Sequence, residues 1–95
     1  MENLNQNYCE MNKLARNISG MCLRPAMYAG KDATVGELYN FLVGVTTGYS
    51  LGIDDMTIDS EITDILRKSY SECNGSLDDF CSSVRKRLFE EYSTK

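Results

Sequence analysis

Residues 34–49 read Thr-Val-Gly-Glu-Leu-Tyr-Asn-Phe-Leu-Val-Gly-Val-Thr-Thr-Gly-Tyr, and this stretch decides the fold class. It opens with a capping box, in which the hydroxyl of Thr34 stands three residues before the carboxylate of Glu37. Behind the box, apolar side chains recur at spacings of three and four. They are Leu38, Phe41, Leu42, Val45 and Tyr49. Because that spacing places them on one side of an α-helix, we expect a helix with one buried face.

The same segment carries glycine at every fourth position, at Gly44, Gly48 and Gly52, which we call the glycine face. A glycine inside a soluble helix costs up to about 1 kcal/mol relative to alanine. Three of them on one side therefore predict that another helix of the same chain packs closely there. A groove, or a helix that bends or frays, would be the alternative.

Three further segments show helical periodicity. The first runs from about Tyr8 to Cys22, the second from about Ser60 to Cys73 and the third from Ser76 to Tyr92. Their apolar positions are Tyr8, Met11, Leu14, Ala15, Ile18 and Met21 or Cys22; Ile62, Ile65, Leu66, Tyr70 and Cys73; and Leu77, Phe80, Cys81, Val84, Leu88 and Tyr92. Residues 54–59 are expected to be a connection between helices.

The fold class that follows is all-α, a compact bundle of about four amphipathic helices. Ninety-five residues are enough for one hydrophobic core, so residues 1–95 are expected to form a single domain. Residues 1–6 and 93–95 are expected to be flexible. We find no alternation of apolar and polar residues long enough to predict a strand.

The four cysteines are Cys9, Cys22, Cys73 and Cys81, and the chain contains no histidine. Their wide spacing does not match a zinc site, which favours close Cys-x-x-Cys pairs. We expect buried or half-buried free thiols rather than a metal site or disulfides. The missing histidine also removes the commonest general base, and the chain has no phosphate-binding glycine loop. We therefore expect neither an enzyme nor a cofactor.

No apolar run approaches the roughly 20 residues that a membrane-spanning helix needs. The first residues lack the basic start and apolar stretch of a secretory signal, so we expect a cytoplasmic protein without membrane contact. The net charge of −4 argues against direct nucleic-acid binding, which requires lysine and arginine to neutralise phosphates. It is compatible with a basic protein as partner, and equally with plain solubility.

Acidic side chains gather in one short segment that contains no lysine or arginine. They are Asp54, Asp55, Asp59, Glu61 and Asp64. One interpretation is a solvated loop followed by a favourable first helical turn. The sharper one is an exposed negative patch that docks on the basic active site of a nuclease-like protein. Asp78 and Asp79 are further candidates for such a patch, although a helix start explains them as well.

The chain also contains Arg24-Pro25-Ala26-Met27-Tyr28-Ala29-Gly30, followed by Phe41-Leu42-Val43-Gly44. This pair of elements resembles a group of small bacterial proteins that look like the immunity proteins of toxin–immunity systems. The resemblance covers residues 24–49. It departs from the group's pattern at position 26, which is alanine instead of glycine, and at position 45, which is valine instead of tyrosine.

The motif residues Arg24, Pro25, Met27, Tyr28 and Gly30 have two interpretations. In one they only fold the chain, with Met27 and Tyr28 closing the end of the bundle. In the other they contact a partner.

The resemblance implies a protein that binds and neutralises a cognate bacterial toxin, and the acidic patch would suit a nuclease. Two alternatives stay open at this point. One is an anti-defence inhibitor of a host nuclease complex, encoded by a phage or mobile element. The other is a helical assembly module that forms a homodimer through the glycine face.

Overall fold

The protein is an all-α globule, and a computed structural model describes the backbone of residues 2–92 and the side chains of residues 9–92. Its helices are α1 (Glu2–Leu23), α2 (Pro25–Ala29), α3 (Val35–Gly52), α4 (Met56–Glu72) and α5 (Leu77–Glu91). Four long helices and one short turn confirm the fold class predicted from periodicity. In the described part of the chain there is no strand.

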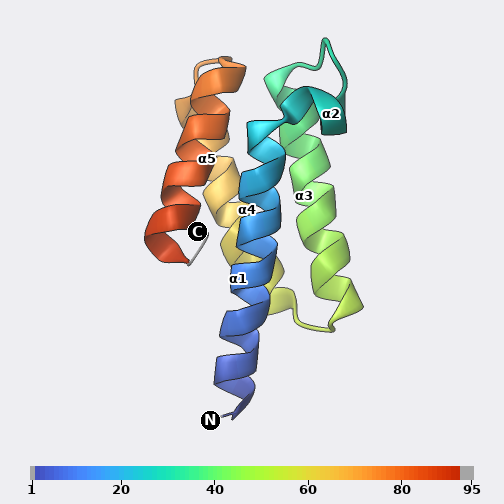
Figure 1. Ribbon diagram of the computed structural model, residues 1–95, viewed down its shortest axis with the longest axis vertical. Coiled ribbons are helices and arrows are strands. Elements are labelled where there is room, and N and C mark those ends of the chain that lie inside the picture. Colours follow the sequence, from blue (N-terminus) through green and yellow to red (C-terminus); the bar gives the residue numbers. More distant parts are fainter. Residues whose placement is uncertain (1, 93–95) are drawn as a thin grey trace.

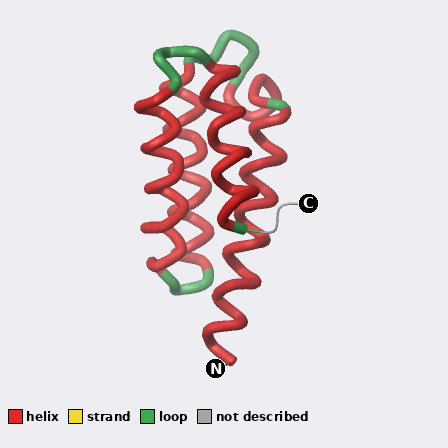
Figure 2. Tube along the Cα trace, turned by 90° about the vertical axis from the view of Figure 1, so that its left-hand side faces the viewer, coloured by secondary structure: helices red, strands yellow, loops and turns green. Residues whose placement is uncertain are grey.

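The long helices lie side by side along the length of the molecule (Figures 1 and 2). α4 packs against both α3 and α5, and α5 packs against α1, so neighbours in the bundle follow the order α3, α4, α5, α1. α2 lies at one end, across α1 and α3. The turn between α3 and α4 is at the opposite end from the α4–α5 turn. We call the end with α2 and the α4–α5 turn the α2 end, and the opposite end the α3–α4 end.

The core is built mostly from the apolar positions that the helical spacing singled out, although Tyr70 is exposed and Ile58 is an addition to them. Its fully enclosed side chains come from all four long helices: Leu14, Ile18, Leu38, Leu42, Ile58, Ile62, Leu66, Phe80, Val84 and Leu88. Beside it, the ring of Tyr39 in α3 stacks on that of Tyr70 in α4, with ring centres 4.5 Å apart. Phe80 of α5 meets both rings edge-on.

Local signals set the helix ends much as the sequence indicates. Thr34 and Glu37 form the complete capping box, in which each side chain accepts a hydrogen bond from the other residue's backbone N–H. The Ser76 hydroxyl accepts from the N–H of Asp79 at the start of α5. Asn74 and Gly75 both have positive φ, which gives the tight turn after α4.

Two expected boundaries are wrong. α4 begins at Met56 rather than near Ser60, because Asp55 caps it by accepting a hydrogen bond from the N–H of Thr57. Asp59 therefore lies on α4 and not in the expected connection. α1 begins at Glu2, well before Tyr8. Met1 and residues 93–95 lie outside the described residues, and the expected flexibility of residues 1–6 and 93–95 stays a prediction.

The close packing predicted for the glycine face is also wrong. A methyl group added at Gly44, Gly48 or Gly52 would meet no atom within 4 Å outside the helix's own backbone and the adjacent residues. All three glycines are exposed. The reason is that α3 turns a different side, at Leu38, Leu42, Thr46 and Ser50, into the bundle.

Of the four thiols, Cys22, Cys73 and Cys81 are buried, as expected, whereas Cys9 is exposed on α1. No helix in the described residues is both long enough and apolar enough to cross a bilayer.

Candidate functional site

The five carboxylates of the acidic run do not act alike once they are placed on the fold. Asp55 is occupied in capping α4. Asp59 accepts a hydrogen bond of 2.7 Å from the Thr47 hydroxyl and a longer one from Thr63, so it ties α3 to α4. Both carboxylates therefore have a clear structural role.

Asp64 is held between two cations one turn further along α4. Arg67 and Lys68 both pair with it, and the Lys68 distance is 3.0 Å. The hydrogen bond from Lys68, followed by that from Arg67, lowers the pKa of the Asp64 carboxyl below its ordinary value. Because Arg67 and Lys68 are largely exposed, water screens both of their ion pairs with Asp64, and these pairs add little stability.

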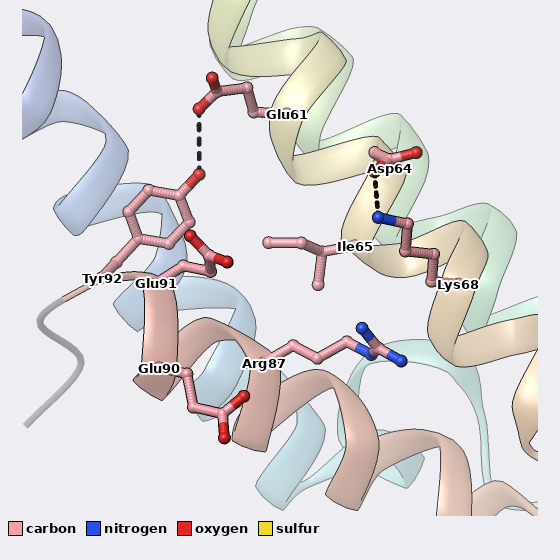
Figure 3. Close-up of a pocket in the computed structure, with 8 residues that line it drawn as sticks. All are labelled: Glu61, Asp64, Ile65, Lys68, Arg87, Glu90, Glu91 and Tyr92. Atoms are coloured by element: carbon pink, nitrogen blue, oxygen red, sulfur yellow. Dashed lines mark hydrogen bonds and ion pairs between the residues drawn. The ribbon is translucent and has the colours of Figure 1, made fainter.

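Glu61 behaves differently because it faces another helix. Its carboxylate accepts a hydrogen bond of 3.2 Å from the phenol of Tyr92, directly after α5 (Figure 3). Glu61 and Asp64 line a groove between α4 and the end of α5, with a volume of about 240 Å³. We call this the acidic groove; its lining residues are Glu61, Asp64, Ile65, Lys68, Arg87, Glu90, Glu91 and Tyr92.

Glu90 and Glu91 are the acidic groove's second pair of carboxylates, and they stand at an unfavourable position. They occupy the last turn of α5, which contains no basic residue. A helix C-terminus carries partial negative charge, so carboxylates there reduce stability. Within the side chains that the structure describes, no cation lies in ion-pair distance of either one.

The acidic groove also holds two cations, Lys68 and Arg87, at its α2 side. Lys68 pairs with Asp64, and Arg87 pairs with Glu72 of α4. These cations are thus engaged within the protein. The charge left over in the groove is negative and comes from Glu61, Glu90 and Glu91.

The remaining acidic candidates lie elsewhere. Asp54 is exposed in the turn between α3 and α4, with a φ of 55°. Asp78 and Asp79 start α5 at the α2 end, so the structure does not bring them together with Asp54 and Asp55. The sequence reasoning missed Glu90, Glu91 and Tyr92. An acidic pair at the end of a helix is the signal that could have revealed them.

The motif residues form α2 and the turns on either side of it. Pro25 is its first residue, which suits a ring that fixes φ and needs no donor. Gly30 has a φ of 108°, a conformation that side-chain-bearing residues rarely adopt. Both therefore have a folding role.

Met27 does not close the end of the bundle, because 66% of its surface is exposed. Tyr28 is 42% exposed, and its ring lies 6.1 Å from that of Phe41 in α3. The interpretation in which both residues plug the bundle is thus wrong for Met27 and holds only in part for Tyr28. The reason is that α2 has no buried residue and lies on the surface of α1 and α3.

Arg24 and Tyr28 share a shallow hollow with the end of α1, which we call the arginine hollow. Its lining residues are Arg16, Asn17, Gly20, Met21, Leu23, Arg24 and Tyr28. Neither arginine has a carboxylate partner among the described side chains. The arginine hollow and the acidic groove have no lining residue in common.

The described residues contain no cluster of three or more side chains suited to hold a metal ion. Comparison with protein families, curated proteins and solved structures finds no match to this chain.

Proposed function

We propose that this protein binds and neutralises a basic partner protein, a toxin of the nuclease type, by laying its acidic groove over the partner's active site. The observation that carries the proposal is the pair Glu90 and Glu91. Their charges reduce folding stability at the end of α5, yet both residues line the same groove as Glu61. Carboxylates without cations at such a position are available to a positively charged surface.

Charge complementarity supports the choice of partner. An active site that binds RNA or DNA must present lysine and arginine to phosphates. A surface with net negative charge is attracted to such a site over long range, which speeds association and competes with the substrate. The resemblance of residues 24–49 to immunity-type proteins points to the same role.

The test is capture of the partner with tagged protein from the source organism, followed by a nuclease assay. Wild type is expected to retain one basic protein and to inhibit its cleavage of RNA or DNA. The double variant Glu90→Lys/Glu91→Lys should neither retain nor inhibit it. The matched control is Asp32→Lys/Asn40→Lys/Ser71→Lys, which changes net charge equally at exposed positions away from the acidic groove. If both variants inhibit as well as wild type, the acidic groove is not the contact.

The same proposal covers an anti-defence inhibitor, because a host nuclease would present the same basic surface. The position of the gene separates the two, since an immunity gene lies beside its toxin gene. The homodimer alternative has its own support in the exposed glycine face on α3. Light scattering during gel filtration distinguishes it, because a homodimer has twice the mass of the single chain.

A further inference from the structure

Two of the three buried thiols lie against each other where α1 packs on α5. Cys22 is near the end of α1 and Cys81 is in the first half of α5. Cys22 and Cys81 line one cavity, and each thiol shifts the pKa of the other through a side-chain hydrogen bond. Cys73 differs, because its thiol donates to the backbone carbonyl of Tyr70.

The pair lines a cavity at the α2 end, beside Pro25. The cavity has a volume of about 230 Å³, and exposed residues such as Leu23, Ser82 and Arg85 form its rim. Cys22 and Cys81 are both part of its lining. A small molecule that enters the cavity therefore meets both cysteine residues.

The surroundings give the two thiols different acidities. The hydrogen bond from Cys22, assisted by the Arg85 guanidinium, lowers the pKa of Cys81, although burial and Asp78 oppose the shift. The hydrogen bond to Cys81 and burial raise the pKa of Cys22. One thiol is thus favoured as the attacking thiolate and the other as the proton-bearing partner, as in reactive dithiol pairs.

We propose that Cys22 and Cys81 are a modification site, at which a low-molecular-weight disulfide oxidises the two thiols to a reversible disulfide between α1 and α5. This inference does not rest on the proposed function. The acidic groove and the thiol pair have no residue in common.

The reaction is two thiol–disulfide exchanges. The Cys81 thiolate attacks one sulfur of the small disulfide, which breaks the sulfur–sulfur bond and releases one small thiolate. Cys22 then loses its proton and attacks the sulfur of Cys81, and the second small thiolate leaves. The protein loses two protons and two electrons, and the small disulfide gains them as two thiols.

The bridge would hold α5 to α1 and close a long loop in the chain, which restricts the unfolded ensemble. Cys22 and Cys81 stand on packed helices and line one cavity, so the bridge would form where α1 and α5 already meet. We therefore expect the oxidised protein to melt at a higher temperature than the reduced one, and a reductant to reverse the change.

The test is to incubate the full chain with oxidised glutathione and map the cross-linked peptides by mass spectrometry. The expected product is a monomer that has lost two hydrogen atoms, with residues 22 and 81 joined. Cys9→Ser and Cys73→Ser should still form it, whereas Cys22→Ala and Cys81→Ala should not. If either alanine variant fails to fold, the cross-linked peptides of the wild-type protein alone show whether residues 22 and 81 are joined.

The rate at which Cys81 is oxidised tests the role of Arg85 in the cavity lining. Arg85→Gln should slow the loss of free Cys81 by about two- to threefold near neutral pH, because the Arg85 guanidinium helps to lower the pKa of that thiol. Its neighbour Lys86, exposed but not part of the cavity lining, gives the matched control Lys86→Gln, which should react at the wild-type rate. Cross-links that involve only Cys9 or Cys73, or a pair that stays reduced at high oxidised glutathione, would overturn the proposal.

Discussion

The phenol of Tyr92 donates a hydrogen bond to the carboxylate of Glu61, which lies 31 residues earlier in the chain. This contact joins the residue that follows α5 to the exposed side of α4, and it forms one wall of the acidic groove (Figure 3). It therefore positions a carboxylate that the proposed function requires.

Removing this hydrogen bond should change stability only slightly. Tyr92→Phe and Glu61→Gln are each expected to cost about 1 kcal/mol or less, because the bond is exposed to water. A double-mutant cycle measured by urea unfolding gives the coupling between the two residues, which should lie below about 1 kcal/mol. A much larger coupling would show that the contact is shielded from solvent.

Reversing the charges of Glu90 and Glu91 should stabilise the protein. Lysines in the last turn of α5 interact favourably with the helix dipole, so each replacement should add about 0.3–1 kcal/mol at low salt. Thermal unfolding of Glu90→Lys/Glu91→Lys checks this, and the gain should shrink at high salt. If the double variant is more stable but no longer binds the partner, Glu90 and Glu91 reduce folding stability and are needed for binding.

Asp64 should make stability depend on pH in the acidic range. Its folded-state pKa is lowered by Lys68 and Arg67, so the ionised form favours folding above the unfolded-state pKa. That contribution is lost as the pH falls through the lowered pKa. Asp64→Asn should melt slightly below wild type at pH 7, and the two melting temperatures should converge in strong acid. A variant that melts above wild type at pH 7 would contradict the interpretation.

Filling the glycine face should stabilise α3. Gly44→Ala and Gly48→Ala add a methyl group in open space, so each should gain up to about 1 kcal/mol from helix propensity. Urea unfolding measures the gain. A loss of stability at either position would instead favour the close packing that the sequence predicted.

Ser50 offers a stabilising change inside the core. It is fully buried, and its hydroxyl has no hydrogen-bond partner among the described residues. Ser50→Ala removes that unsatisfied group and improves helix propensity, so it should gain about 1 kcal/mol or more. Buried Thr46 is a suitable comparison, because its hydroxyl bonds the carbonyl of Leu42. Removal of that hydroxyl in Thr46→Val should give a smaller gain or a loss.

The sequence predicts the four long helices and most of the core because helical periodicity is a local property. The capping signals at Thr34 and Ser76 set two starts correctly for the same reason. The start of α4 is not predicted correctly, because Asp55 caps the helix although the sequence places it among several expected loop carboxylates.

The candidate site is less accessible to such reasoning. Glu61 meets Tyr92, and shares a groove with Glu90, only because α4 and α5 pack together, and no local pattern specifies which residues face each other across two helices. Counting acidic residues along the chain gave equal weight to Asp59 and Glu61. The fold separates them, since Asp59 is tied to Thr47 whereas Glu61 faces the acidic groove.

The open glycine face has a practical consequence for mapping contacts on this molecule. At Gly44 and Gly48 the outer surface of α3 exposes peptide groups and has no side chain to remove. Alanine scanning measures what is lost when a side chain is truncated, so it detects nothing at these positions. A partner that rests on this part of α3 would be revealed only by substitutions that add bulk.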